Sequence, residues 1–93
     1  MRLDTHLNLH VKSTAPFFDL ERSGRKPNTI RLVDESEQDM CIRAKRIIVH
    51  GPGDEQFKRT ITGVFDITEV VPLDATIAGD KRVVLLEWGG ERT

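Results

Sequence analysis

Residues 23–27 impose a change of structure on the chain. Gly24 suits the left-handed conformation that closes a helix. Pro27 lacks a backbone N–H and pushes Lys26 towards an extended conformation, so a helix cannot continue through it. We therefore predict that a helix ends near Gly24 and that a strand begins near Asn28.

An alternating pattern defines the two faces of that strand, which runs to about Val33. Ile30 and Leu32 share one face, and we expect them to point into the core. Thr29 and Arg31 then project from the opposite face, roughly 6–7 Å apart along the strand. With Lys26 just before them, this hydroxyl between cations is a candidate site for an anion or a polar ligand. Spacing alone favours the alternative, a surface strand with solvated charges.

Residues 3–12 alternate apolar and polar side chains, which predicts one half-buried strand. His6 and His10 share its polar face. On a strand they lie about 13 Å apart, too far to share one ion. We therefore expect no metal site there.

A short helix is expected to follow this strand. Ser13 or Thr14 can cap the helix, and Pro16 fits its first turn. Helical spacing assigns two groups of side chains, with Phe17, Phe18 and Leu20 in the core and Asp19, Glu21 and Arg22 in solvent. The aromatic pair is thus assigned to the core rather than to stacking on bases.

The rest of the chain is predicted to form short strands separated by turns. The segments are an acidic loop at 34–39, a strand at 40–49 bulged near Lys45, a turn at 50–54, a strand at 57–70 bent at Gly63, a loop at 71–80 with a short helical turn near 74–77, and a central strand at 83–86 followed by the buried Trp88. The predicted fold class is α+β, mainly β: a small barrel of five to six strands with one short N-terminal helix.

Composition limits the class of protein. The 93 residues make one small domain, which we assign to residues 1–88 with a flexible tail at 89–93. The formal net charge is −1, so any nucleic-acid contact must come from a local basic face. The single cysteine, Cys41, excludes an internal disulfide, and no apolar run resembles a signal peptide or a membrane span. We expect a cytoplasmic protein that does not bind membranes.

The run from Phe17 to Lys26, with Thr29-Ile30-Arg31 after it, resembles the opening of an ASCH domain of the small phage and bacterial type. Residues 5–9 are similar to the first strand of such proteins. The resemblance covers the first third of the chain and implies a PUA-like β-barrel. It also implies binding of RNA, a nucleotide or a modified nucleoside, without a cofactor, in a basic cleft that contains Arg25, Lys26, Thr29 and Arg31.

The same family includes amidohydrolases that deacetylate 4-acetylcytidine, which gives an alternative function. The resemblance implies Thr29 as the nucleophile and Lys26 as its activating base. The acidic partner comes from later in the family sequence, and Glu69 is the nearest candidate here, ahead of Glu87. A second alternative is an accessory protein of a mobile element that binds a host protein, for which the sequence offers no argument in either direction.

Overall fold

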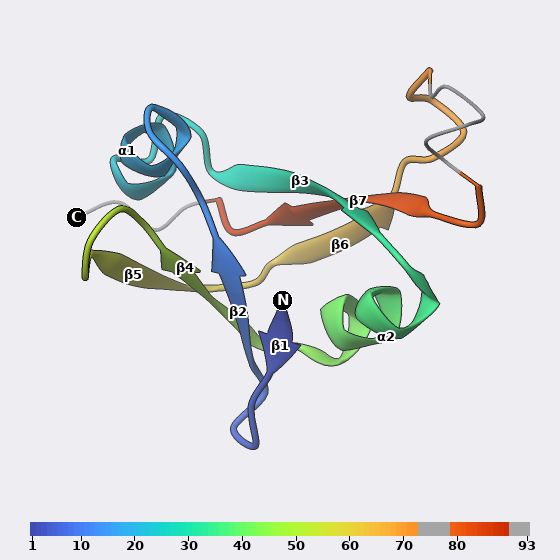
Figure 1. The fold of residues 1–93 in the computed structure, drawn as a ribbon, viewed down its shortest axis with the longest axis horizontal. Helices are drawn as coiled ribbons and strands as arrows, with labels where there is room; N and C mark the ends of the chain where they lie inside the picture. Colours follow the sequence, from blue (N-terminus) through green and yellow to red (C-terminus); the bar gives the residue numbers. More distant parts are fainter. Residues whose placement is uncertain (73–78, 90–93) are drawn as a thin grey trace.

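The computed structural model describes residues 1–72 and 79–89. Over these residues the chain forms seven strands and two helices (Figure 1). In chain order these are β1 (Arg2–Leu3), β2 (Asn8–Lys12), α1 (Phe17–Arg22), β3 (Asn28–Val33), α2 (Glu35–Arg43), β4 (Arg46–His50), β5 (Gln56–Thr60), β6 (Gly63–Asp66) and β7 (Arg82–Glu87). A mainly β fold is therefore confirmed.

The strands assemble into two sheets. A four-stranded sheet has the order β1-β2-β4-β5, and a three-stranded sheet has the order β3-β7-β6. All pairs are antiparallel except β2 and β4, which run parallel. Because the described strands lie in two separate sheets, closure into the predicted barrel is not confirmed.

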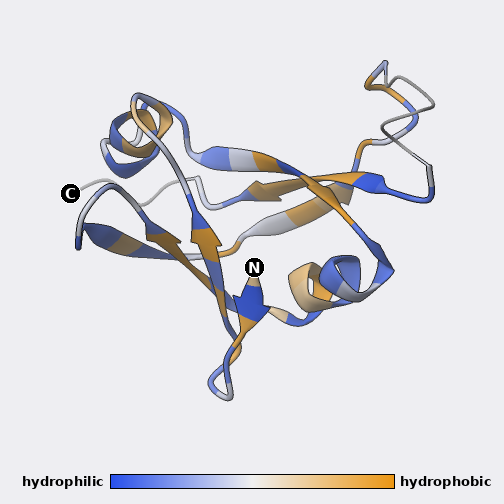
Figure 2. Ribbon diagram, viewed as in Figure 1, coloured by the Kyte–Doolittle hydropathy of each residue, from blue (hydrophilic) through white to orange (hydrophobic). Residues whose placement is uncertain are grey.

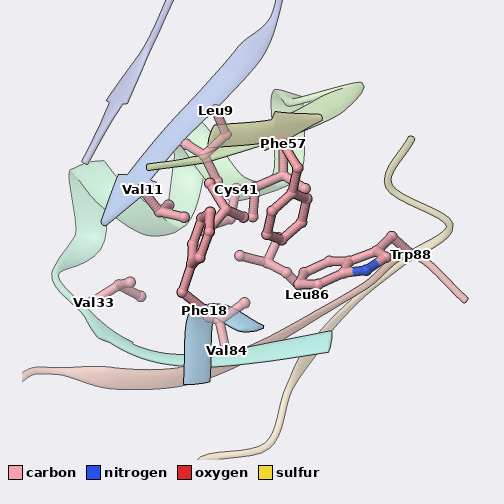
Figure 3. Close-up of a cluster of buried hydrophobic side chains, with 11 residues drawn as sticks. Leu9, Val11, Phe18, Val33, Cys41, Phe57, Val84, Leu86 and Trp88 are labelled. Carbon is pink, nitrogen blue, oxygen red and sulfur yellow. The ribbon is translucent and has the colours of Figure 1, made fainter. Parts of the chain in front are cut away.

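The core fills the space between the two sheets and includes side chains from both helices (Figure 3). Phe18 of α1 packs against Phe57, and Phe57 meets the edge of Trp88. Trp88 is 1% exposed, which confirms its predicted burial, and β7 is the central strand of its sheet as predicted. The buried cluster comprises Leu9, Val11, Phe18, Val33, Cys41, Ile47, Val49, Phe57, Val84, Leu86 and Trp88.

The strand predicted near residues 28–33 is confirmed as β3, but its two faces are the reverse of the prediction. Ile30 and Leu32 are 54% and 44% exposed, whereas Thr29 is 3% exposed. Alternation separates two faces without telling which one points inward. Here the inward face can hold polar groups because they bind one another: Nε of Arg31 donates to Oγ1 of Thr29.

The acidic loop at 34–39 and the strand from residue 40 were wrong predictions, because α2 occupies residues 35–43. Asp34 and Glu37 form a capping box: each side chain accepts a hydrogen bond from the backbone N–H of the other. The change of parity assigned to a bulge near Lys45 is instead the passage from α2 into β4. A second helix therefore joins the single helix that was predicted.

Two strands predicted as continuous are each divided. Residues 4–7 turn the chain between β1 and β2, with Leu7 at a positive φ of 62°. The strand predicted over 57–70 splits into β5 and β6, and Gly63 stands at the break, as the predicted bend requires. These divisions raise the number of described strands above the five or six predicted.

Part of the predicted C-terminal half lies outside the described residues. This holds for the predicted helical turn near 74–77 and for the tail, of which only Gly89 is described. Within the described ranges, no helix is long and apolar enough to cross a membrane.

Candidate functional site

A hollow of about 440 Å³ lies where the end of β2, helix α1 and strand β3 meet. We call it the small hollow. Its lining carries three cationic side chains and one carboxylate, so its formal charge is positive. The lining residues are Lys12, Ser13, Thr14, Phe17, Glu21, Lys26, Thr29, Ile30 and Arg31.

Helix α1 brings a buried carboxylate into this hollow. Glu21 stands one turn after Phe18, so both side chains point inward, and Glu21 is 1% exposed. The hydroxyl of Ser13 donates to Oε1 of Glu21 at 2.8 Å. The prediction that Glu21 faces solvent was therefore wrong. The predicted cap at Ser13 was also wrong, because α1 begins at Phe17 and Pro16 is its N-cap residue.

The turn after α1 reverses the chain, so that Lys26 lies against the last turn of the helix. Gly24 has the predicted left-handed conformation, with φ 87°, and the N–H of Lys26 then donates to the carbonyl of Leu20. Nζ of Lys26 lies 3.1 Å from Oε2 of Glu21 and 2.9 Å from the carbonyl oxygen of Asn28. The ammonium is thus held by a carboxylate that the sequence did not assign to it.

The hydroxyl of Thr29 and the guanidinium of Arg31 are adjacent on the inward face of β3. Nε of Arg31 lies 3.1 Å from Oγ1 of Thr29. Burial lowers the pKa of Arg31 from its ordinary value, while the carboxylate of Glu21 acts in the opposite direction. Arginine retains its charge under such shifts because its ordinary pKa is so high. A partly desolvated cation therefore faces the hollow.

Phe17 is 53% exposed, which corrects its predicted place in the core. Its ring lines the small hollow, and Nζ of Lys26 lies 6.0 Å from the ring centroid. Phe18 alone of the pair is buried. Adjacent residues point to different sides of a helix, so burial of Phe18 leaves Phe17 as an exposed aromatic surface in the lining of the hollow.

Two predicted site residues do not join this group. Arg25 is exposed in the turn and does not line the hollow. Glu69 is exposed, and its Oε1 lies 3.9 Å from a terminal guanidinium nitrogen of Arg82. Arg82 pairs with Val33 at the far end of β3. That end is about 17 Å along the strand from Asn28, so Glu69 is remote from the hollow. The carboxylate beside Lys26 is therefore Glu21. The predicted second choice, Glu87, pairs with Asn28 on the outward side of the three-stranded sheet.

A larger hollow of about 1030 Å³ adjoins the small one, and we call it the large hollow. The two share Lys12, Ser13, Thr14 and Arg31 in their linings, so they lie side by side. A histidine pair lies on the wall of the large hollow: the rings of His10 and His50 stack with centroids 5.2 Å apart.

Hydrogen bonds fix how this histidine pair is protonated in its neutral state. Nε2 of His10 lies 2.9 Å from the carboxylate of Asp4, which can only accept, so Nε2 carries the proton. Nδ1 of His10 then accepts from Nε2 of His50 at 2.9 Å and from the guanidinium of Arg2 at 3.5 Å. The bond from His10 and the amide of Asn8 hold the pKa of Asp4 well below its usual range. Burial lowers the pKa of His50, helped by His10 and by the nearby charges of Arg2 and Lys12. The predicted strand over 3–12 concealed this cluster, since the turn at 4–7 brings Asp4 back to His10.

Among the described residues, no group of three or more histidine, cysteine, aspartate or glutamate side chains is arranged to hold a metal ion. No protein-family model, curated protein or solved structure matches the chain. The resemblance to ASCH domains therefore stays a prediction.

Proposed function

We propose that the small hollow binds a nucleotide, free or as a unit of RNA, or a modified nucleoside. One observation carries the proposal: an exposed aromatic ring, Phe17, shares a hollow with two inward-facing cations, Lys26 and Arg31. Bases stack on exposed aromatic side chains, and guanidinium groups bind phosphate through paired nitrogens. The hollow's volume also falls within the range of small-ligand sites.

Each of these groups has a separate part in the proposed complex. Nε of Arg31 donates a hydrogen bond to Oγ1 of Thr29. The two terminal nitrogens of the guanidinium can still donate to a phosphate. Lys12 adds a charge at the junction of the two hollows. The contact between Glu21 and Lys26 fixes the ammonium beneath the ring of Phe17 and so orders the floor of the site before ligand arrives.

The test is isothermal titration of the protein with uridine monophosphate. Arg31→Ala and Phe17→Ala should each weaken binding by about tenfold or more, because a charge-assisted contact or a stacked base contributes roughly 1–3 kcal/mol. Arg43→Ala on α2 and Phe65→Ala on β6 are matched controls, since both residues are exposed and neither lines a hollow. Equal losses in the controls, or no binding by the unaltered protein, would contradict the proposal.

A second candidate function, amide hydrolysis on an acylated pyrimidine nucleoside, is favoured by one further observation. Thr29, Lys26 and Glu21 line the same hollow. In this scheme the hydroxyl of Thr29 attacks the acyl carbonyl, the nucleoside leaves with a proton, and water then hydrolyses the acyl-threonine. Lys26 must first lose a proton to act as a base, and Glu21 is the adjacent acceptor.

A chromatographic deacetylation assay with 4-acetylcytidine separates the two functions. Thr29→Val keeps the shape of this buried side chain and removes only the hydroxyl. Turnover that disappears in Thr29→Val supports hydrolysis. Absence of turnover in the unaltered protein, with binding retained, leaves ligand binding as the function.

A further inference from the structure

The outward face of the four-stranded sheet carries an ordered set of polar and cationic side chains. Leu9, Val11, Ile47, Val49 and Phe57 are buried, so the residues between them in β2, β4 and β5 point away from the core. Strand pairing arranges the outward side chains in three rows across the sheet: Asn8, Arg46 and Thr60; Arg2, His10, Ile48 and Lys58; and Lys12, His50 and Gln56.

This outward face is strongly basic although the whole chain has a net charge of −1. It presents Arg2, Lys12, Arg46 and Lys58 together with the histidine pair, and the rows include no aspartate or glutamate. The carboxylate bound to the histidine pair, Asp4, belongs to the turn between β1 and β2. Asp4 also bonds to Asn8, so the face carries one carboxylate against four cationic side chains and keeps a local positive field.

Neither helix covers this face. Helices α1 and α2 bury Phe18, Glu21 and Cys41 on the core side of the sheets, at opposite ends of the molecule (Figure 1). Three cationic residues of the face, Arg2, Lys12 and Lys58, are all exposed. The edge strand β5 is mostly hydrophilic (Figure 2).

The basic face is continuous with the hollows already described. The large hollow is lined by Arg2, His10, Lys12 and His50 from the face, and by Arg31 from the small hollow. Lys12 belongs to the face and to both hollows. A chain of phosphates leaving the small hollow can therefore pass Lys12 directly onto the sheet.

We propose that this outward face binds the sugar–phosphate backbone of a single-stranded nucleic acid, one nucleotide of which occupies the small hollow. The inference rests on the proposed function. It extends the ligand from one nucleotide to a polymer. It also adds a second contact surface, which includes Arg2, Lys12 and Lys58.

The composition of the face favours nucleic acid over an acidic protein. The buried centres of protein–protein interfaces are apolar and depleted in charge, whereas the one large apolar side chain in these rows is Ile48. Interfaces with nucleic acid are polar and strongly positive. The rows contain no phenylalanine, tyrosine or tryptophan to stack on bases. The face therefore contacts phosphate without reading sequence, and its affinity depends on salt.

The test is fluorescence anisotropy with a short labelled oligouridylate over a series of salt concentrations. For single strands the slope of log K against log salt is about −0.7 for each phosphate contact, so Arg2→Ala and Lys58→Ala should each reduce its magnitude by about 0.7. Arg43→Ala removes the same charge from α2 and should leave the slope unchanged. Equal slopes in all variants would overturn the inference.

Titration with uridine monophosphate distinguishes failure of this inference from failure of the proposed function. Lys58 lines neither hollow, so Lys58→Ala should leave mononucleotide affinity unchanged while Arg31→Ala lowers it. If Arg31→Ala lowers mononucleotide affinity and the face variants leave the oligonucleotide slope intact, only the face is contradicted. Binding of polyglutamate or phosphatidylserine vesicles as tightly as RNA, with the same dependence on Lys58, would overturn the choice of nucleic acid.

Discussion

Nζ of Lys26 lies 3.1 Å from Oε2 of Glu21, a carboxylate that is almost wholly removed from solvent. Ser13 satisfies the second carboxylate oxygen, and the carbonyl of Asn28 accepts a further bond from the ammonium. A buried charge is tolerated only when it is paired and hydrogen-bonded in this way. The contact ties α1 to the start of β3 and fixes one wall of the small hollow.

Replacing Glu21 with glutamine should destabilise the protein by about 1–3 kcal/mol. The substitution removes a charged partner from a buried pair, and the partial exposure of Lys26 reduces the cost from that of a fully buried ion. Urea unfolding measures the change. Glu55→Gln is the matched control, because Glu55 is exposed and contacts Arg22 at the surface, where such pairs contribute little. Equal effects of the two substitutions would contradict the role given to Glu21.

Gly51→Ala should destabilise the protein by about 1–3 kcal/mol, the usual cost of forcing extra atoms into a packed core. A Cβ at residue 51 would lie 2.5 Å from ring atoms of Phe18, which is itself packed against Phe57. Gly89→Ala is the control, since a Cβ there meets nothing within 4 Å. Thermal unfolding of both variants gives the comparison, and similar midpoints would show that Phe18 can move aside.

Acidification should remove a contribution of Asp4 to stability. Its pKa is lower in the folded protein than in the unfolded chain, first because of the bond from His10. The stabilisation is therefore present above the unfolded value, about pH 4, and is lost as the pH falls through the folded value. Urea unfolding of Asp4→Asn should show a deficit at neutral pH that shrinks below about pH 4. A deficit that is independent of pH would contradict this linkage, and Asp54→Asn in the exposed β4–β5 turn controls for the charge.

Cys41 should react slowly with iodoacetamide in the folded protein. Its side chain is fully buried, and desolvation, with a smaller effect from Glu37, raises its pKa from 9.0 to about 11. A pKa raised by about two units leaves about 100-fold less thiolate at mildly alkaline pH. Mass spectrometry should therefore detect little labelling until urea is added. Rapid labelling without urea would place Cys41 outside the core.

Local patterns predicted much of the secondary structure around the site. The break at Gly24 and Pro27 correctly ended a helix and began β3, because both residues restrict the backbone whatever surrounds them. Alternation correctly placed Thr29 and Arg31 on one face. It could not show that this face points inward, since that depends on which side of β3 the other sheet lies.

The partners of Lys26 and His10 depend on tertiary structure, and the sequence did not reveal them. Glu21 was assigned to solvent because it is charged, although its spacing from Phe18 puts both on one helical face. His50 meets His10 through the parallel pairing of β2 with β4, across 40 residues of sequence. The helix α2 had a local signal that was missed, the capping box of Asp34 and Glu37.

The most direct test of the central claim is to record amide chemical shifts by NMR as uridine monophosphate is added. Binding in the small hollow should move the amide signals of Thr14, Phe17, Lys26 and Arg31 more than those of β6, which lies two strands from β3 and does not line the hollow. Saturable shifts at these positions, lost in Arg31→Ala, are the predicted result. Shifts confined to other parts of the protein would contradict the claim that this hollow binds a nucleotide. The absence of any shift at the highest soluble concentration of uridine monophosphate would contradict it as well.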